Sequence, residues 1–213
     1  MCNVGCDGRC NGGCNGGCNG KCVTIKLGLS SPHLQVHCGV LFFEPNGFHP
    51  SGEGFTLTPS LIRPQSVGQI RLRSADPTER PIIEPRYLSD SGGQDMAMLV
   101  AGVKHVREIG REMLQAMGGR GAELHPGGEI QSDAQIEEYV RSYVGTMYHP
   151  ACTCRVGRAD DGGAVLDEQM RVRGASRLRV ADASAMPEIV GANTNATCIA
   201  LGEKVADLVA RAA

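Results

Sequence analysis

The residues best suited to chemistry lie in one stretch near the C-terminal end of the chain. His149 stands on a predicted loop just before a proline, and a histidine held in this way can act as a base near neutral pH. About forty residues later, Asn193, Thr194 and Asn195 open a predicted helix. Such a helix end offers side-chain caps and free N–H groups, which stabilise negative charge. The pattern is compatible with base catalysis beside a phosphate or a reduced ring, and equally with a structural histidine and an ordinary cap.

A metal site is a competing interpretation of the same stretch, because His149, Cys152 and Cys154 are three possible ligands. Their spacing, H-x-x-C-x-C, is not a common zinc pattern, and no fourth ligand is close in sequence. Free cysteine also packs as a small buried apolar residue. We therefore predict no metal at these residues.

Cysteine usage divides the chain at residue 22. The body of the chain holds four cysteines, a number typical of a reduced, cytosolic protein. The first 22 residues are a Cys/Asn/Gly low-complexity tract, predicted to be disordered because it has almost no apolar residues. Repeated thiolates suit Zn or Cu(I), whereas the paired Cys-x-x-Cys of structural zinc sites is absent, so a tract without a native role is the other interpretation. Its cysteines recur at every fourth position: Cys2, Cys6, Cys10, Cys14, Cys18 and Cys22.

Residues 23–213 are predicted to fold as an α+β body. Strands are expected at 35–43, 54–62 and 69–73, and short strands around Gly174 within 165–180. Apolar spacing predicts a helix over 95–117, and Ser132 with Gln135 forms a capping-box pattern at the start of a second. A third helix is expected over about 195–212, with Ile199, Val205, Leu208 and Val209 inward. Strands precede helices, which favours an α+β class with a mixed or antiparallel sheet backed by helices.

Composition excludes several classes of function. The chain has 213 residues with 21 Lys and Arg against 23 Asp and Glu, a net charge of −2, which disfavours a nucleic-acid surface. No apolar stretch approaches the ~20 residues of a membrane helix, and the signal-peptide pattern is absent. We therefore expect a cytoplasmic protein. The sequence contains neither the G-x-G-x-x-G dinucleotide fingerprint nor a phosphate-binding P-loop.

Several motifs, in order, resemble the C-terminal part of the glucose–methanol–choline (GMC) oxidoreductases, and the choline-dehydrogenase-like branch above all. They extend over roughly 31–209. The segments that carry the resemblance are residues 63–77, 83–89, 148–157, 178–187, 193–196 and 202–207.

The resemblance implies FAD-dependent oxidation of a small-molecule alcohol to an aldehyde or ketone. His149 matches the catalytic histidine that takes the hydroxyl proton, and Asn193 the second residue that hydrogen-bonds the substrate oxygen. Asp182 and Ala183 resemble the backbone stretch beside FAD, and Thr194 with Asn195 the turn that contacts the flavin ring. The fold implied is the substrate-binding domain, with a C-terminal segment that would complete an FAD-binding domain.

The sequence departs from the family pattern in two ways. Cys152 stands where members usually carry glycine, which affects the fit of a substrate. The glycine-rich FAD fingerprint of the family's N-terminal half is missing, and the cysteine tract stands in its place. Three interpretations follow: a fragment inactive alone, a half-enzyme completed by a separate FAD-binding subunit, or a non-catalytic binding or metal-sequestering protein. We expect the chain to expose apolar surface where that half would pack.

Overall fold

The computed structural model describes residues 22–25, 32–40, 42–44, 47–49, 54–119 and 121–211. The tract predicted to be disordered therefore lies outside the described residues, except for Cys22. The chain divides into two compact units. Unit 1 comprises residues 1–67 and 86–145, and unit 2 comprises residues 68–85 and 146–213.

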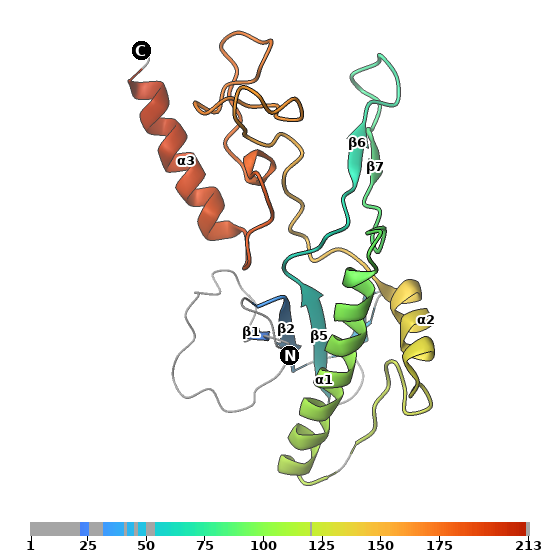
Figure 1. Cartoon of the computed structure of the whole chain (residues 1–213). Coiled ribbons are helices and arrows are strands. Elements are labelled where there is room, and N and C mark those ends of the chain that lie inside the picture. The colour runs from blue at the N-terminus through green and yellow to red at the C-terminus, as the bar shows by residue number, and fades with distance from the viewer. Residues whose placement is uncertain are drawn as a thin grey trace. The chain divides into compact units, whose positions relative to one another are not determined.

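Unit 1 contains a three-stranded antiparallel sheet covered by a long helix (Figure 1). The sheet has the order β1-β2-β5, and a separate pair, β3 with β4, is also antiparallel. The helix α1 packs on β2 and β5, and α2 packs on α1. The elements are β1 (Cys22–Ile25), β2 (Leu34–Gly39), β3 (Phe42–Glu44), β4 (Gly47–His49), β5 (Thr56–Leu61), α1 (Gln94–Ala116) and α2 (Asp133–Tyr143).

The core of unit 1 follows the helical periodicity of the sequence. Apolar residues spaced by three and four along α1 are buried against α2, and Val106 packs with Val36 of β2. At Gly102 the helix lies so close to the sheet that a Cβ atom would come 2.9 Å from Pro59 Cβ. The buried apolar residues of the larger cluster are Met96, Leu99, Val100, Val103, Ile136 and Val140.

Polar side chains hold the N-terminal ends of both α1 and α2. The predicted capping box is present, with the Ser132 hydroxyl accepting from the Gln135 N–H and the Gln135 side chain accepting from the Ser132 N–H. The buried carboxylate of Asp95, in the first turn of α1, accepts from the N–H groups of Gln65 and Ser66 and from the Ser66 hydroxyl. These bonds fix the chain just before it leaves unit 1.

Unit 2 consists of a two-stranded hairpin, a short 3₁₀ turn, one helix and much irregular chain. The hairpin pairs β6 (Gln69–Arg71) with β7 (Ile82–Glu84), and η1 (Ala183–Ala185) precedes α3 (Asn195–Ala210). The short strands expected around Gly174 are present only as isolated bridges, such as Leu166 with Val172.

The outcome for the predicted elements is mixed. The three helices lie where they were expected, and the chain combines helices with small antiparallel sheets. The strand expected over 35–43 is divided into β2 and β3, because β2 pairs with β1 and β5 while β3 pairs with β4. The prediction for α3 was partly wrong: Val205 is buried, but Ile199 is 57% and Val209 48% exposed. Apolar residues lie all around this helix, so its periodicity does not select one face.

Candidate functional site

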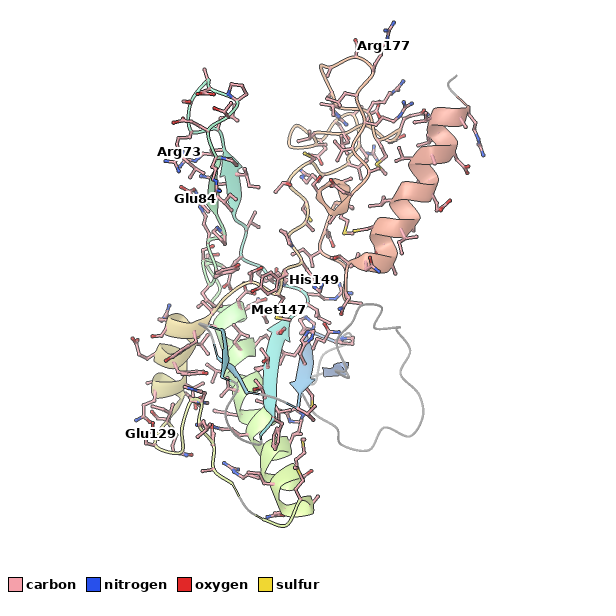
Figure 2. The ribbon with its side chains drawn as sticks, turned by 180° about the vertical axis from the view of Figure 1, so that it is seen from behind. Arg73, Glu84, Glu129, Met147, His149 and Arg177 are labelled. Carbon is pink, nitrogen blue, oxygen red and sulfur yellow. The ribbon has the colours of Figure 1, made fainter. Side chains whose placement is uncertain are left out.

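His149 lies on the irregular segment that follows α2, and its side chain is half-buried (Figure 2 labels it beside Met147). Two residues with left-handed backbone bracket it, Tyr148 with φ of 60° and Cys152 with φ of 72°. The Tyr148 N–H donates to the Thr146 hydroxyl at 2.9 Å, which holds the first of them. Such conformations are costly for residues with a Cβ and are often found at functional sites.

Backbone hydrogen bonds join the segment after His149 to η1. The N–H of Cys152 donates to the carbonyl of Ala183 at 3.2 Å, and that of Cys154 to the carbonyl of Ser184 at 2.9 Å. The N–H of Val156 donates to the carbonyl of Ala185 at 3.0 Å. The structure thus brings the loop of the predicted base next to the Asp182–Ala183 stretch, about thirty residues away in sequence.

Asp182 organises the short turn that accepts those bonds. Its Oδ1 atom accepts from the Ser184 N–H at 2.8 Å and from the Ser184 hydroxyl at 2.5 Å. This cap fixes the carbonyl groups of η1 in the direction of the histidine segment. The end of the turn is also buried, with Ala185 0% and Met186 2% exposed.

The 183–185 turn and α3 pack on the same small apolar core. Leu166 is fully buried and packs with Met170, with Ala185 of η1 and with Val205 of α3. The bridge from Leu166 to Val156 brings the histidine segment into the same cluster. The two segments predicted to contact a cofactor are therefore held by one set of apolar contacts within unit 2.

Thr194 and Asn195 form the start of α3. The Thr194 carbonyl accepts the first helical bond, from the Cys198 N–H at 3.0 Å, and Thr194 is 7% exposed. The Thr194 side chain makes no capping hydrogen bond, so this part of the expectation of side-chain caps was wrong. Asn195 and Ala196 are exposed, which leaves the first turn open to an acceptor outside the chain. Asn193, half-buried, lies two residues before the helix.

The charged groups near the histidine segment stiffen it. Arg155 holds Asp161 through two bonds, Nη1 to Oδ2 at 2.5 Å and Nη2 to Oδ1 at 2.8 Å. These bonds, with the Gly163 N–H, lower the pKa of Asp161.

Burial raises the pKa of the Cys152 thiol, the charge of Glu188 adds to the rise, and Arg155 opposes it. The thiol is therefore protonated near neutral pH and is a weak nucleophile.

Two specific features are absent from the described residues, a cluster of metal ligands and a helix able to span a membrane. Among them, no three His, Cys, Asp or Glu side chains gather where they could hold a metal ion. In the same part of the chain, no helix is long and apolar enough to cross a membrane.

Sequence reasoning missed the pairing of residues 152–156 with 183–185. Nothing in a single sequence specifies a contact between two irregular segments thirty residues apart.

The fit of these residues to a flavin can be judged from the structure itself. The open first turn of α3 supplies N–H donors and the positive end of a helix, which suit an anionic or electron-rich ring edge. The fixed 182–185 turn supplies ordered backbone beside the histidine segment. The residues present fit such a group.

Comparison with known proteins gives a consistent result. The family model described as GMC oxidoreductase matches residues 64–202. Choline oxidase of Arthrobacter globiformis is 42% identical over 186 residues, covering 85% of this chain and 34% of its own length. Human mitochondrial choline dehydrogenase is 41% identical over 185 residues, covering 85% and 30%. The chain thus spans about a third of the length of these curated relatives.

Solved structures agree at the level of the fold. Pyridoxine 4-oxidase from Mesorbium loti matches with a TM-score of 0.72 and 31% identity, covering 84% of this chain and 34% of that protein. An Aspergillus oryzae formate oxidase variant studied for its FAD modification matches with a TM-score of 0.74 and 26% identity, covering 85% and 32%.

Proposed function

Because the chain belongs to the GMC oxidoreductase family, we propose that it forms the catalytic C-terminal part of an FAD-dependent enzyme that oxidises an alcohol to an aldehyde or ketone. The observation that carries the proposal is the backbone pairing of Cys152 with Ala183, which supports a common site for His149 and the cofactor-facing stretch.

His149 is the base in this proposal. When bound, FAD supplies the hydride acceptor for the carbon that carries the hydroxyl group. His149 takes the proton from that hydroxyl, and the negative charge that develops on the oxygen makes the carbon a better hydride donor. The left-handed residues on either side of His149 restrict the backbone of its loop.

Three other elements support the same step. Asn193 donates a hydrogen bond to the substrate oxygen and orients the alcohol. The open N-terminus of α3, at Thr194 and Asn195, would present N–H donors and the positive end of a helix to the cofactor, where they would favour negative charge. Asp182 and Ala183 border the cofactor through the turn that the Asp182 carboxylate caps.

We further propose that the FAD site is completed by a polypeptide that carries the glycine-rich fingerprint. The chain contains no G-x-G-x-x-G, and it spans about a third of its relatives. Exposed apolar side chains in unit 2, including Ile83, Leu178 and Ile199, support a missing packing partner.

The experiment is an absorption spectrum after desalting, with FAD added to the chain alone and to the chain mixed with an FAD-binding N-terminal part of a GMC enzyme. We expect the chain alone to retain no flavin and the mixture to retain it. Addition of an alcohol in the absence of oxygen should then bleach the flavin absorbance of the mixture. Flavin retained by the chain alone would contradict the partner requirement. A flavin-loaded mixture that no alcohol in a panel of choline, aliphatic and aromatic alcohols reduces would contradict the activity.

A further inference from the structure

A recess in unit 1 lies between α2 and residues 125–130, part of the segment that joins α1 to α2 (Figure 2 labels Glu129 on this segment). Its volume of about 280 Å³ is just below the range of roughly 300–1,000 Å³ typical of pockets for drug-sized ligands, so it suits a smaller molecule. The recess shares no residue with the proposed oxidoreductase site. Its lining includes His125, Ile130, Glu138, Tyr139, Ser142 and Tyr143.

Hydrogen bonds hold the 125–130 segment in place. The buried guanidinium of Arg107, on α1, donates from Nη2 to the Gly127 carbonyl at 3.0 Å. The Ile130 N–H donates to the same carbonyl at 3.1 Å, and Gln131 Nε2 donates to the Gly128 carbonyl at 2.6 Å. This wall of the recess is therefore formed before a ligand arrives, which lowers the conformational cost of binding.

Three aromatic rings meet at the recess. Tyr139 and Tyr143 lie one turn apart on α2, and their ring centroids are 4.7 Å apart with an angle of 31° between the planes. The His125 ring centroid lies 6.2 Å from that of Tyr143, with the planes tilted by 51°. Tyr143 is 45% exposed, so part of its ring is open to a ligand. Because the face of a phenol ring carries partial negative charge, the tyrosine faces attract a cation that contacts them.

The charges around the recess favour the same sign of ligand. Of the Asp, Glu, Lys and Arg residues that the structure describes, Glu138 alone lines it. Arg107, behind the segment, has a side chain only 7% exposed and donates to Glu123 at 2.7 Å, so its charge is compensated. Among the described residues no three metal-ligating side chains gather, so a metal ion would lack protein ligands here.

We propose that this recess binds a small organic cation whose charged nitrogen carries alkyl groups. An alkylated ammonium group has few or no N–H donors, so ring faces and a carboxylate suit it better than a set of hydrogen-bond acceptors. The tyrosine faces contact its alkyl groups, Ile130 adds apolar surface, and Glu138 supplies the opposite charge. The site is independent of the proposed function, because it uses other residues and needs no flavin.

The test uses the whole chain with tetramethylammonium as the probe, at constant chloride concentration and ionic strength. Saturation-transfer NMR detects contact between the protein and the methyl protons of the cation, and its dependence on cation concentration gives the dissociation constant. We expect saturable binding, and binding of tert-butanol, a neutral molecule of the same size, that is weaker by at least about fivefold. Absence of saturable binding, or equal binding of the two molecules, would overturn the proposal.

Variants locate the bound cation. We expect Tyr143→Leu to weaken binding by about two- to fivefold, the effect of one exposed cation–π contact, and Tyr143→Phe to preserve it. Tyr87→Leu is the matched control, at a tyrosine that is 44% exposed, and should change nothing. Glu138→Gln should also weaken binding, and circular dichroism checks that each variant remains folded. Loss of binding in His149→Ala with full binding in Tyr143→Leu and Glu138→Gln would place the cation at the proposed oxidoreductase site and overturn the recess.

Discussion

The N–H of Cys152 donates to the carbonyl oxygen of Ala183 at 3.2 Å, and this bond joins the loop of His149 to the stretch proposed to border the cofactor. It is the first of three such bonds, and all three end on the turn that Asp182 caps. The position of the loop that carries the proposed base therefore depends on backbone hydrogen bonds. A side-chain substitution should move this loop only where it strains the backbone.

Position 152 should accept glycine, whereas a β-branched side chain there should destabilise the fold. Its φ of 72° is left-handed, where glycine is free of strain and a β-branched residue is most hindered. We expect Cys152→Val to lower the free energy of unfolding by about 1–2 kcal/mol and Cys152→Gly by less. Urea denaturation of both, with Cys154→Val as the matched control, measures the difference. Equal losses in the valine and glycine variants would contradict the strain.

Leu166 should be the most sensitive apolar residue of unit 2. It is fully buried, takes part in isolated bridges with Val156 and Val172, and packs with Ala185 of η1 and Val205 of α3. Truncation leaves a cavity among them, so Leu166→Ala should cost about 2–5 kcal/mol of unfolding free energy. Leu178→Ala, at a leucine that is 52% exposed, should stay within about 0.5 kcal/mol. Thermal melts compare the two, and similar shifts would mean that Leu166 is not the centre of this core.

The pair of Arg155 with Asp161 should make stability depend on acid. Hydrogen bonds from Arg155 and the Gly163 N–H hold the pKa of Asp161 below its ordinary value of 3.8. Folding thus favours the ionised form, so the contribution is complete at neutral pH and is lost as the pH falls through the lowered pKa. Asp161→Asn should reduce stability at pH 7 and flatten the acid limb of a stability–pH curve. Asp160→Asn, in a well-exposed pair, should leave that curve unchanged.

Local sequence patterns were enough to predict the helices. Spaced apolar residues indicated α1, and Ser132 with Gln135 fixed the start of α2, because both signals act within one or two turns of chain. Three short strands were missed: β1, β4 and β7 have three or four residues each, too few to show an alternation. The outward face of α3 could not be chosen, since Ala, Ile and Val surround that helix.

The candidate site was predictable in its residue types and not in its geometry. His149 and Asn193 could be proposed from family motifs, but the bonds from Cys152 to Ala183 and from Cys154 to Ser184 join segments without regular structure. Such contacts depend on tertiary packing around Leu166, which leaves no periodic trace in the sequence.

The most direct test of the account is the rate of flavin reduction by alcohol, measured against pH in the FAD-loaded assembly of this chain with its FAD-binding part. His149→Gln is compared with His105→Gln, at a half-buried position on α1 where the Nδ1 atom lies 3.6 Å from Glu108 Oε2. Loss of a general base should slow reduction by about 10²–10⁴-fold and remove the rise of rate with pH that an imidazole base produces, while His105→Gln should match the parent. A His149→Gln enzyme with an unchanged rate and pH profile would contradict the assignment of His149 as the base.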